Sequence, residues 1–284
     1  QTRSYTELAA DTKYNYLASW NKRLSVLADR KIKDLRTADL QAVIDEAADA
    51  GMSKSTLSKD KALMTQLYEY AMKNDFVKRN YAELVELPRG DDTAERTPFS
   101  DEELAKIDKA VGTVPFADCV LMMCFTGFRI AEFLELKPSS YDPSIPAVTG
   151  GKKTKAGKGR VIPLNPRIDG LFRRWVEKGG QTIICRPDGK PYTPKYFRDK
   201  CYYPALEQIG VRRLVPHCTR HTFATLCEKA GLRPEEIKKL MGHTKYEMSL
   251  HYTHADLEQL KNAVSLLAYR VTNTLPTHKN AGDI

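Results

Sequence analysis

A polar stretch near residue 90 constrains the fold of this chain more than any other feature, because it separates two parts that must fold on their own. The sequence PRGDDTAERTP (residues 88–98) is bounded by prolines and almost free of apolar side chains. This composition is typical of a linker between domains. At 284 residues the chain is long enough for about two domains. We therefore expect one domain on each side of the linker.

Residues before the linker carry the spacing of helices. Apolar side chains recur every three or four residues through residues 5–30, again after Thr37, and again after Ser53 or Ser55. Thr37 and one of the two serines are candidate N-cap residues, because a side-chain oxygen there can accept a free backbone N–H. The sequence therefore predicts an all-helical bundle over residues 1–87.

Residues after the linker predict helices around one small sheet. Ser100 and Glu103 form a capping box that opens a helix through Val111, and PFADCVLMMCFTG (115–127) is apolar enough to lie in the centre of a domain. Residues 147–164 have β-branched ends around a middle rich in Gly and Lys, which predicts a hairpin with a basic tip. Further helices are expected over residues 166–178, 194–209, 217–230, 234–242 and 256–270.

The charge of the chain is uneven. The formal net charge is +9, yet residues 1–100 carry 16 basic and 16 acidic side chains, so the whole excess lies in residues 101–284. The decapeptide GKKTKAGKGR (151–160) alone holds five cations and no acid. A polyanion partner and an ordinary solvated basic face explain this distribution equally well.

Composition narrows the class of protein. With 42% hydrophobic and 29% charged residues, the chain is typical of a globular protein. It has neither an apolar run of the roughly 18 residues that span a bilayer nor an apolar signal peptide, so we expect a cytoplasmic protein. The missing initiator Met suggests a fragment with an upstream segment. The six cysteines form no CxxC pair and are expected to be reduced, mostly buried thiols.

Four separated segments contain side chains that could carry chemistry: TGFRIAEFLEL (126–136), KTKAGKGRVIPL (153–164), HCTRH (217–221) and LMGHTKYEMSLHYTH (240–254). Taken singly, each has a simpler explanation. Arg129 could be a surface arginine paired with Glu132. His217 and His221 have the spacing of zinc ligands, but no HExxH glutamate and no nearby Cys or Asp completes a tetrahedral set. We therefore expect no metal site.

Together the four segments resemble the tyrosine recombinase (phage integrase) family. The family pattern of Arg, Lys, His-x-x-Arg, His and Tyr is filled in the correct order by Arg129, Lys155, His217, Arg220, His243 and Tyr252. The nine-residue interval from His243 to Tyr252 fits the family, as do Glu132 and the R-V-I-P-L run. Asn80-Tyr81, where relatives often have Asn-Pro, departs from the pattern at a domain exit only.

The resemblance implies a fold and a domain plan. It implies a mostly α protein with the tyrosine recombinase fold, in which a helical core-binding bundle precedes a mainly helical catalytic domain with a small antiparallel sheet. The expected boundaries are 1–87 for the core DNA-binding domain, 88–98 for the linker, 99–255 for the catalytic domain and 256–284 for a C-terminal helix and tail.

The resemblance also implies a site-specific recombinase of the integrase or conjugative transposase type, acting through a 3′-phosphotyrosyl intermediate in integration and excision. Two guanidinium forks, from Arg129 and Arg220, suit the charge that spreads over phosphate oxygens. His243 would add a hydrogen bond, and Tyr252 would be the nucleophile. His217 would accept its proton and Lys155 would protonate the leaving 5′-oxygen. Glu132 and His221 are expected to support the site, and no metal or other cofactor is required.

Several alternatives stay open. Tyr246, Cys218 and Cys227 are competing nucleophiles, although Tyr246 lies at the wrong interval from His243. A type IB topoisomerase would use the same tyrosine and cations to cut and reseal one strand. A catalytically silent DNA-binding protein of the same fold is a further alternative, and a metal-dependent hydrolase is a more distant one.

The expected partners are double-stranded DNA and further copies of the chain. The lysines expected to contact DNA are Lys54, Lys59 and Lys61 in the first domain and Lys152, Lys153 and Lys158 in the hairpin tip. A narrow apolar stripe also runs along residues 256–270, formed by Leu257, Leu260, Val264 and Leu267. It could pack in its own subunit, or, as the resemblance implies, dock on a neighbour in a DNA-bound tetramer.

Overall fold

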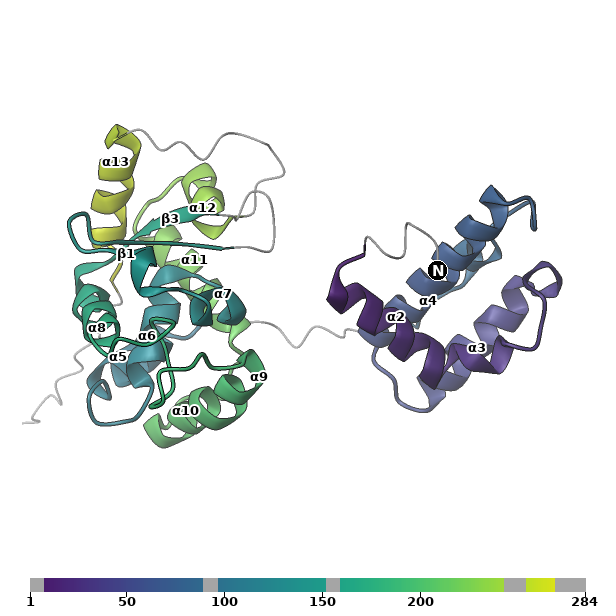
Figure 1. Cartoon of the computed structure of the whole chain (residues 1–284), viewed down its shortest axis with the longest axis horizontal. Coiled ribbons are helices and arrows are strands. Elements are labelled where there is room, and N and C mark those ends of the chain that lie inside the picture. The colour runs from purple at the N-terminus through teal and green to yellow at the C-terminus, as the bar shows by residue number, and fades with distance from the viewer. Residues whose placement is uncertain (1–7, 89–96, 152–158, 243–253, 269–284) are drawn as a thin grey trace, which may run out of the picture. The chain divides into compact units, whose positions relative to one another are not determined.

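The chain forms two compact units, residues 1–94 and 95–284, whose division lies inside the predicted linker. The computed structural model describes residues 8–88, 97–151, 159–242 and 254–268. The regular elements described in the first unit are all helices, whereas the second unit combines helices with a small sheet (Figure 1). Each unit has its own apolar core.

The first unit is a bundle around one long helix. Its elements are α2 (Ala10–Lys22), η1 (Leu24–Leu27), η2 (Ile32–Asp34), α3 (Thr37–Asp49), α4 (Lys54–Lys73) and η3 (Tyr81–Leu84). Helices α2 and α3 and the short η3 pack against α4. The residues that share its core include Leu24, Leu40, Ile44, Leu57, Met64 and Tyr68. The predicted helical bundle is therefore confirmed.

The ends of these helices correct two details of the sequence prediction. The Oγ of Ser53 accepts the backbone N–H of Thr56 at 3.3 Å, so Ser53 caps α4 as expected. Thr37, however, is the first residue of α3 and Arg36 is the N-cap. The Thr37 hydroxyl instead donates to the carbonyl oxygen of Tyr81 at 3.0 Å, a contact between distant parts of the chain. The predicted helix over 5–30 ends at Lys22, after which the chain continues as the 3-10 turn η1.

The second unit is built around a buried helix. Its helical elements are α5 (Asp101–Lys109), α6 (Ala117–Thr126), α7 (Ile130–Leu134), η4 (Pro138–Ser140), α8 (Pro166–Val176), α9 (Pro194–Phe197), the π-helical η6 (Arg198–Tyr202), α10 (Tyr203–Ile209), α11 (His217–Lys229), α12 (Pro234–Met241) and α13 (His254–Ser265). Helix α6 packs against α5, α8, α10 and α11. Nine of its ten residues are buried, so this apolar helix lies in the centre as predicted.

A three-stranded antiparallel sheet completes this unit. Its strands are β1 (Tyr141–Asp142), β2 (Ala147–Gly150) and β3 (Arg160–Pro163), in that order across the sheet. The register pairs Val148 with Ile162 and Gly150 with Arg160. The hairpin predicted over 147–164 is thus present, with its tip, residues 152–158, outside the described residues.

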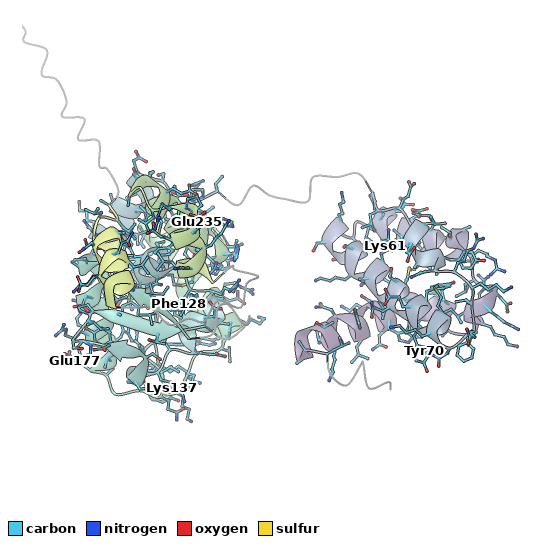
Figure 2. All side chains as sticks on the ribbon, turned by 90° about the horizontal axis from the view of Figure 1, so that it is seen from above. Lys61, Tyr70, Phe128, Lys137, Glu177 and Glu235 are labelled. Atoms are coloured by element: carbon cyan, nitrogen blue, oxygen red, sulfur yellow. The ribbon has the colours of Figure 1, made fainter. Side chains whose placement is uncertain are left out.

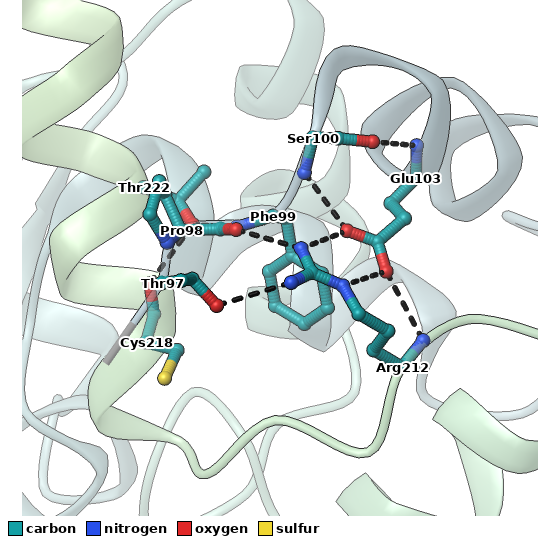
Figure 3. Close-up of polar contacts among 8 residues, drawn as sticks. All are labelled: Thr97, Pro98, Phe99, Ser100, Glu103, Arg212, Cys218 and Thr222. Atoms are coloured by element: carbon teal, nitrogen blue, oxygen red, sulfur yellow. Dashed lines mark hydrogen bonds and ion pairs between the residues drawn. The ribbon is translucent and has the colours of Figure 1, made fainter. Parts of the chain in front are cut away.

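An ion-paired cluster holds the start of the second unit to the segment just before helix α11 (Figure 3). The carboxylate of Glu103 accepts three N–H groups of Arg212: the backbone N–H at 3.1 Å, Nε at 2.8 Å and Nη2 at 2.6 Å. The same guanidinium donates to Thr97 and Pro98. Next to it, the backbone N–H of Phe99 donates to Oγ1 of Thr222 on α11 at 2.9 Å. The first residues after the linker are therefore held directly against α11.

The C-terminal helix packs on its own subunit. Leu260, Val264 and Leu267 are buried in the core of the second unit, and α13 lies against β3. The amide nitrogen of Asn165 donates to the carbonyl oxygens of Val264 at 2.8 Å and Leu267 at 3.1 Å. Of the two arrangements open at the sequence level, this structure has the packing in cis.

Two compositional expectations can be compared with the structure. All six cysteines are free thiols and all are buried, as expected. Among the described residues, no helix is both long and apolar enough to cross a membrane.

Candidate active site

The first predicted site residue, Arg129, lies where the buried helix α6 ends. Gly127 closes that helix with a left-handed φ of 63°. A Cβ at this position would lie 2.4 Å from Cδ1 of Phe223 on α11, so the close approach of the two helices requires glycine. Two residues later, Arg129 is the N-cap of α7. Its side chain keeps 25% of its surface exposed, which leaves it accessible to a ligand.

Glu132 is a buried carboxylate shared by two arginines. Its Oε1 accepts Nη1 of Arg129 at 3.0 Å, and its Oε2 accepts the backbone N–H of Arg129 at 3.1 Å and Nη2 of Arg160 at 2.9 Å. Burial raises the pKa of this carboxyl, but the hydrogen bond and charge of Arg160 and those of Arg129 outweigh it, so the net pKa is lowered. Glu132 is therefore held as an anion between two cations.

Arg220, on α11, is the second guanidinium of the predicted pattern and is almost completely buried. Its Nη1 donates to the carbonyl oxygen of Gly127 at 2.6 Å, and its Nη2 donates to the carbonyl oxygen of Met241 at the end of α12. It thus ties α11 to the loop that presents Arg129 and to the residue two positions before His243. Within the described part of the chain, its Nε–H is buried and has no hydrogen-bond partner.

The electrostatics of Arg220 show an excess of positive charge. Burial, followed by repulsion from Arg129 and Arg160, lowers the pKa of its guanidinium to about 9, while Glu132 opposes this shift. Three arginines therefore influence one another around a single carboxylate. An anion bound beside them would relieve this repulsion, and a phosphate oxygen matches the fork geometry of guanidinium groups.

Two histidines stand on the same helix as Arg220. His217 is the first residue of α11 and His221 lies one turn later, with the ring centroids 4.9 Å apart and the planes at 76°. Both are partly exposed. Within the described ranges, no three His, Cys, Asp or Glu side chains are grouped so as to hold a metal ion.

Comparison with known proteins decides the family. The model of the phage integrase family matches residues 99–259, which is more than half of the chain and contains every site residue described above. The chain belongs to the phage integrase family. This assignment confirms the tyrosine recombinase resemblance of the sequence, and membership of the family supports a role as a DNA recombinase.

Relatives within the phage integrase family cover most of the chain. Tyrosine recombinase XerC of Bacillus licheniformis is 23% identical over 260 residues, spanning 86% of this chain and 85% of XerC. Among solved structures, the Tn1549 transposon integrase in complex with circular intermediate DNA has a TM-score of 0.72 at 20% identity, covering 90% of this chain and 95% of that one. A lambda integrase tetramer bound to a Holliday junction has a TM-score of 0.69 at 18% identity, covering 87% and 75%. The structural likenesses show a shared fold, which confirms the predicted fold class.

The structure brings together only part of the predicted set. Arg129, Arg220 and Glu132 form one cluster, and His217 and His221 lie on the helix that carries Arg220. The other predicted site residues of the second unit lie outside the described residues; they are Lys152, Lys153, Lys155, Lys158, His243 and Tyr252.

The lysines predicted to contact DNA in the first unit differ from one another in the structure. Lys54 and Lys59 are exposed on α4. Lys61, labelled in Figure 2, instead donates to the carbonyl oxygens of Glu83 at 3.2 Å and Val85 at 2.6 Å, so its ammonium already holds the end of η3.

Sequence reasoning missed Arg160, which it counted only as one more charge of the basic hairpin. The guanidinium is fully buried, although the sequence placed it among the basic residues of a hairpin predicted to have a basic tip. The available signal was alternation along the strand, since Arg160 and the buried Ile162 lie on the same face of β3. That pattern placed the charged side chain of Arg160 in the interior, where a charge requires an oppositely charged partner. The sequence alone did not identify this partner.

Proposed function

We propose that this member of the phage integrase family is a site-specific DNA recombinase that cuts and rejoins strands through a 3′-phosphotyrosyl intermediate. The observation that carries this proposal is the convergence of Arg129 and Arg220 on one place, with Arg160 behind them and only Glu132 to offset their charge in the described residues. A scissile phosphate supplies the missing negative charge. Its transition state spreads that charge over non-bridging oxygens, which is where fixed guanidinium donors stabilise most strongly.

The roles of the side chains follow from their chemistry. Arg129 is partly exposed and can donate two N–H groups to phosphate oxygens, while Arg220 contributes a buried charge and an Nε–H. His243 is proposed to donate to the same oxygens and Tyr252 to attack phosphorus. His217, which begins the helix that carries Arg220, is proposed to take the phenol proton.

The reaction balances without a cofactor. The phenol oxygen of Tyr252 forms a bond to phosphorus, and the 5′-oxygen leaves with a proton that Lys155 supplies. The phosphotyrosyl ester keeps the energy of the broken bond. A 5′-hydroxyl of a second strand then attacks the same phosphorus, and the tyrosine oxygen leaves and recovers its proton. The strands are thereby rejoined in a new order.

We further propose that the substrate is the end or junction of a mobile element and that the reaction serves its integration and excision. The fold likeness to the Tn1549 transposon integrase, solved with circular intermediate DNA, supports this assignment. The excess of basic charge in residues 101–284 suits a long contact with the DNA backbone.

Exchange of strands needs several protomers, and we propose a DNA-bound tetramer in which the C-terminal helix docks on a neighbour. Three residues of the apolar stripe, Leu260, Val264 and Leu267, are buried in cis in this structure, and the side chain of Leu257 lies outside the described part, so docking in trans would move the stripe to the same surface of another copy. Deletion of residues 256–284 should then leave DNA binding largely intact and impair recombination. Unchanged recombination by the truncated protein would contradict the docking proposal.

The test of the proposed function is the formation of a covalent adduct. Nicked suicide substrates that carry candidate element ends trap the phosphotyrosyl intermediate, because the short 5′-hydroxyl fragment diffuses away. The wild-type protein should form a protein–DNA adduct, Tyr252→Phe should form none, and the matched control Tyr246→Phe should form it normally. An adduct with Tyr252→Phe would refute the proposed nucleophile. Relaxation of supercoiled DNA without any exchange between sites would indicate a topoisomerase.

A further inference from the structure

Arg160 is a charged side chain buried in the interior of the second unit. It is 0% exposed and begins strand β3, directly after the hairpin tip. Its guanidinium carbon lies 4.5 Å above the ring of Phe128, which is itself fully buried and is labelled in Figure 2. Its Nη2 donates to Oε2 of Glu132 at 2.9 Å. A cation this deep is costly unless it is paired, so the contact with Glu132 explains how it can be tolerated.

The same contact determines what Glu132 does to Arg129. Glu132 is 5% exposed and touches Arg129 at 3.0 Å, a distance at which opposite charges attract strongly in a buried setting. If Arg129 were the only partner of Glu132, the pair would be neutral, and the guanidinium of Arg129 would be held by the carboxylate and away from a ligand. Because Arg160 provides a second positive charge, one carboxylate faces three guanidinium groups when Arg220 is included.

We propose that Arg160 is a positioning residue for strand cleavage, which neutralises Glu132 and so leaves the guanidinium of Arg129 available to the scissile phosphate. Arg160 itself is buried and does not touch the phosphate. The proposal rests on the proposed recombinase function. It also gives the hairpin a role in holding the site, because Arg160 pairs in register with Gly150 at the base of the hairpin and its ion pair with Glu132 joins this base to α7.

A double-mutant cycle tests this role. The variants are Arg160→Met, Glu132→Gln and the combination of the two, measured as the single-turnover rate of adduct formation on the suicide substrate. Arg173→Met is the matched control, because Arg173 is an exposed arginine of α8 paired with Asp169 on the surface. DNA affinity is measured in parallel by gel mobility shift, and thermal unfolding checks that each variant is folded.

If the proposal holds, Arg160→Met slows cleavage by about tenfold to a hundredfold, the cost of a misplaced catalytic group, with unchanged DNA affinity. In the Glu132→Gln background the same substitution should cost no more than about twofold, because no carboxylate remains to be neutralised. Arg160→Lys, which keeps the charge, should cleave faster than Arg160→Met. Arg173→Met should cleave at the wild-type rate.

Equal losses from Arg160→Met in both backgrounds would overturn the positioning role while leaving the recombinase function standing. If Arg160→Met fails to fold, the test is the comparison of Glu132→Gln with the double variant. A much lower cleavage rate in the double variant contradicts the proposal, and a similar rate supports it. Absence of any adduct with the wild-type protein would overturn the proposed function and this inference together.

Discussion

Gly127 gives the sharpest test of how the site is assembled, because alanine there would disturb both the backbone and a helix contact. The residue has φ of 63°, where a Cβ costs about 1–2 kcal/mol. The new Cβ would also lie 2.4 Å from Cδ1 and 2.9 Å from Cγ of Phe223, and overpacking of this kind costs about 1–3 kcal/mol. Together, Gly127→Ala should lower the free energy of unfolding of the second unit by about 2–5 kcal/mol.

A matched control separates the two costs. Gly210 also follows a helix with left-handed φ, 74°, but its Cβ would meet nothing within 4 Å. Gly210→Ala should therefore cost only about 1–2 kcal/mol. Urea unfolding gives the free energies, and the melting temperature should fall by about 2–4 °C for each kcal/mol in a unit of this size. The Gly127 carbonyl accepts a hydrogen bond from Nη1 of Arg220, so Gly127→Ala should also slow cleavage, whereas Gly210→Ala should not. Equal destabilisation by the two substitutions would refute the close-approach argument.

Two further predictions concern the contacts that hold α11 and α13. Burial raises the pKa of Glu103, but the hydrogen bonds and charge of Arg212 outweigh it and lower the net pKa. The pair should therefore stabilise the fold fully above the ordinary pKa of a glutamate carboxyl, and this contribution should be lost as the pH falls through the lowered pKa. The melting temperature of the wild-type protein should thus fall more steeply on acidification than that of Glu103→Gln, and parallel pH curves would contradict this. Asn165→Asp keeps the Oδ1 that accepts the N–H of Arg167 and caps α8, but it removes the amide donor to the carbonyls of Val264 and Leu267. The substitution should lower the free energy of unfolding by about 1–3 kcal/mol and speed hydrogen exchange in α13. The exposed Asn262→Asp on the same helix should change neither, and unchanged exchange in Asn165→Asp would show that the apolar stripe alone holds α13.

Local signals predicted the helices that carry the site. The helices expected over 217–230 and 234–242 are α11 (His217–Lys229) and α12 (Pro234–Met241), because Pro at the start and Gly at the end of α12 mark its boundaries in sequence. The helix expected over 194–209 is interrupted by the π-helical turn η6, which lies just before Pro204, a residue without the N–H that a continuous helix needs.

The long-range partners could not be read in the same way. Arg129 and Glu132 are three residues apart, so their pairing follows from spacing on one helical turn. The pair of Glu132 with Arg160 spans 28 residues and depends on the folded hairpin, and the bond from Arg220 to Gly127 spans 93. Such contacts arise from packing, and a single sequence carries no periodicity that reports them.

The central claim is that Arg129 and Arg220 neutralise the charge of one scissile phosphate. The most direct measurement compares cleavage of a normal substrate with that of a substrate whose scissile position is a neutral methylphosphonate. On the phosphodiester, Arg129→Ala and Arg220→Ala should each slow adduct formation by about a hundredfold to a thousandfold. On the methylphosphonate, which lacks the charge, the loss from each substitution should shrink by about tenfold or more. Equal losses on the two substrates would contradict the claim.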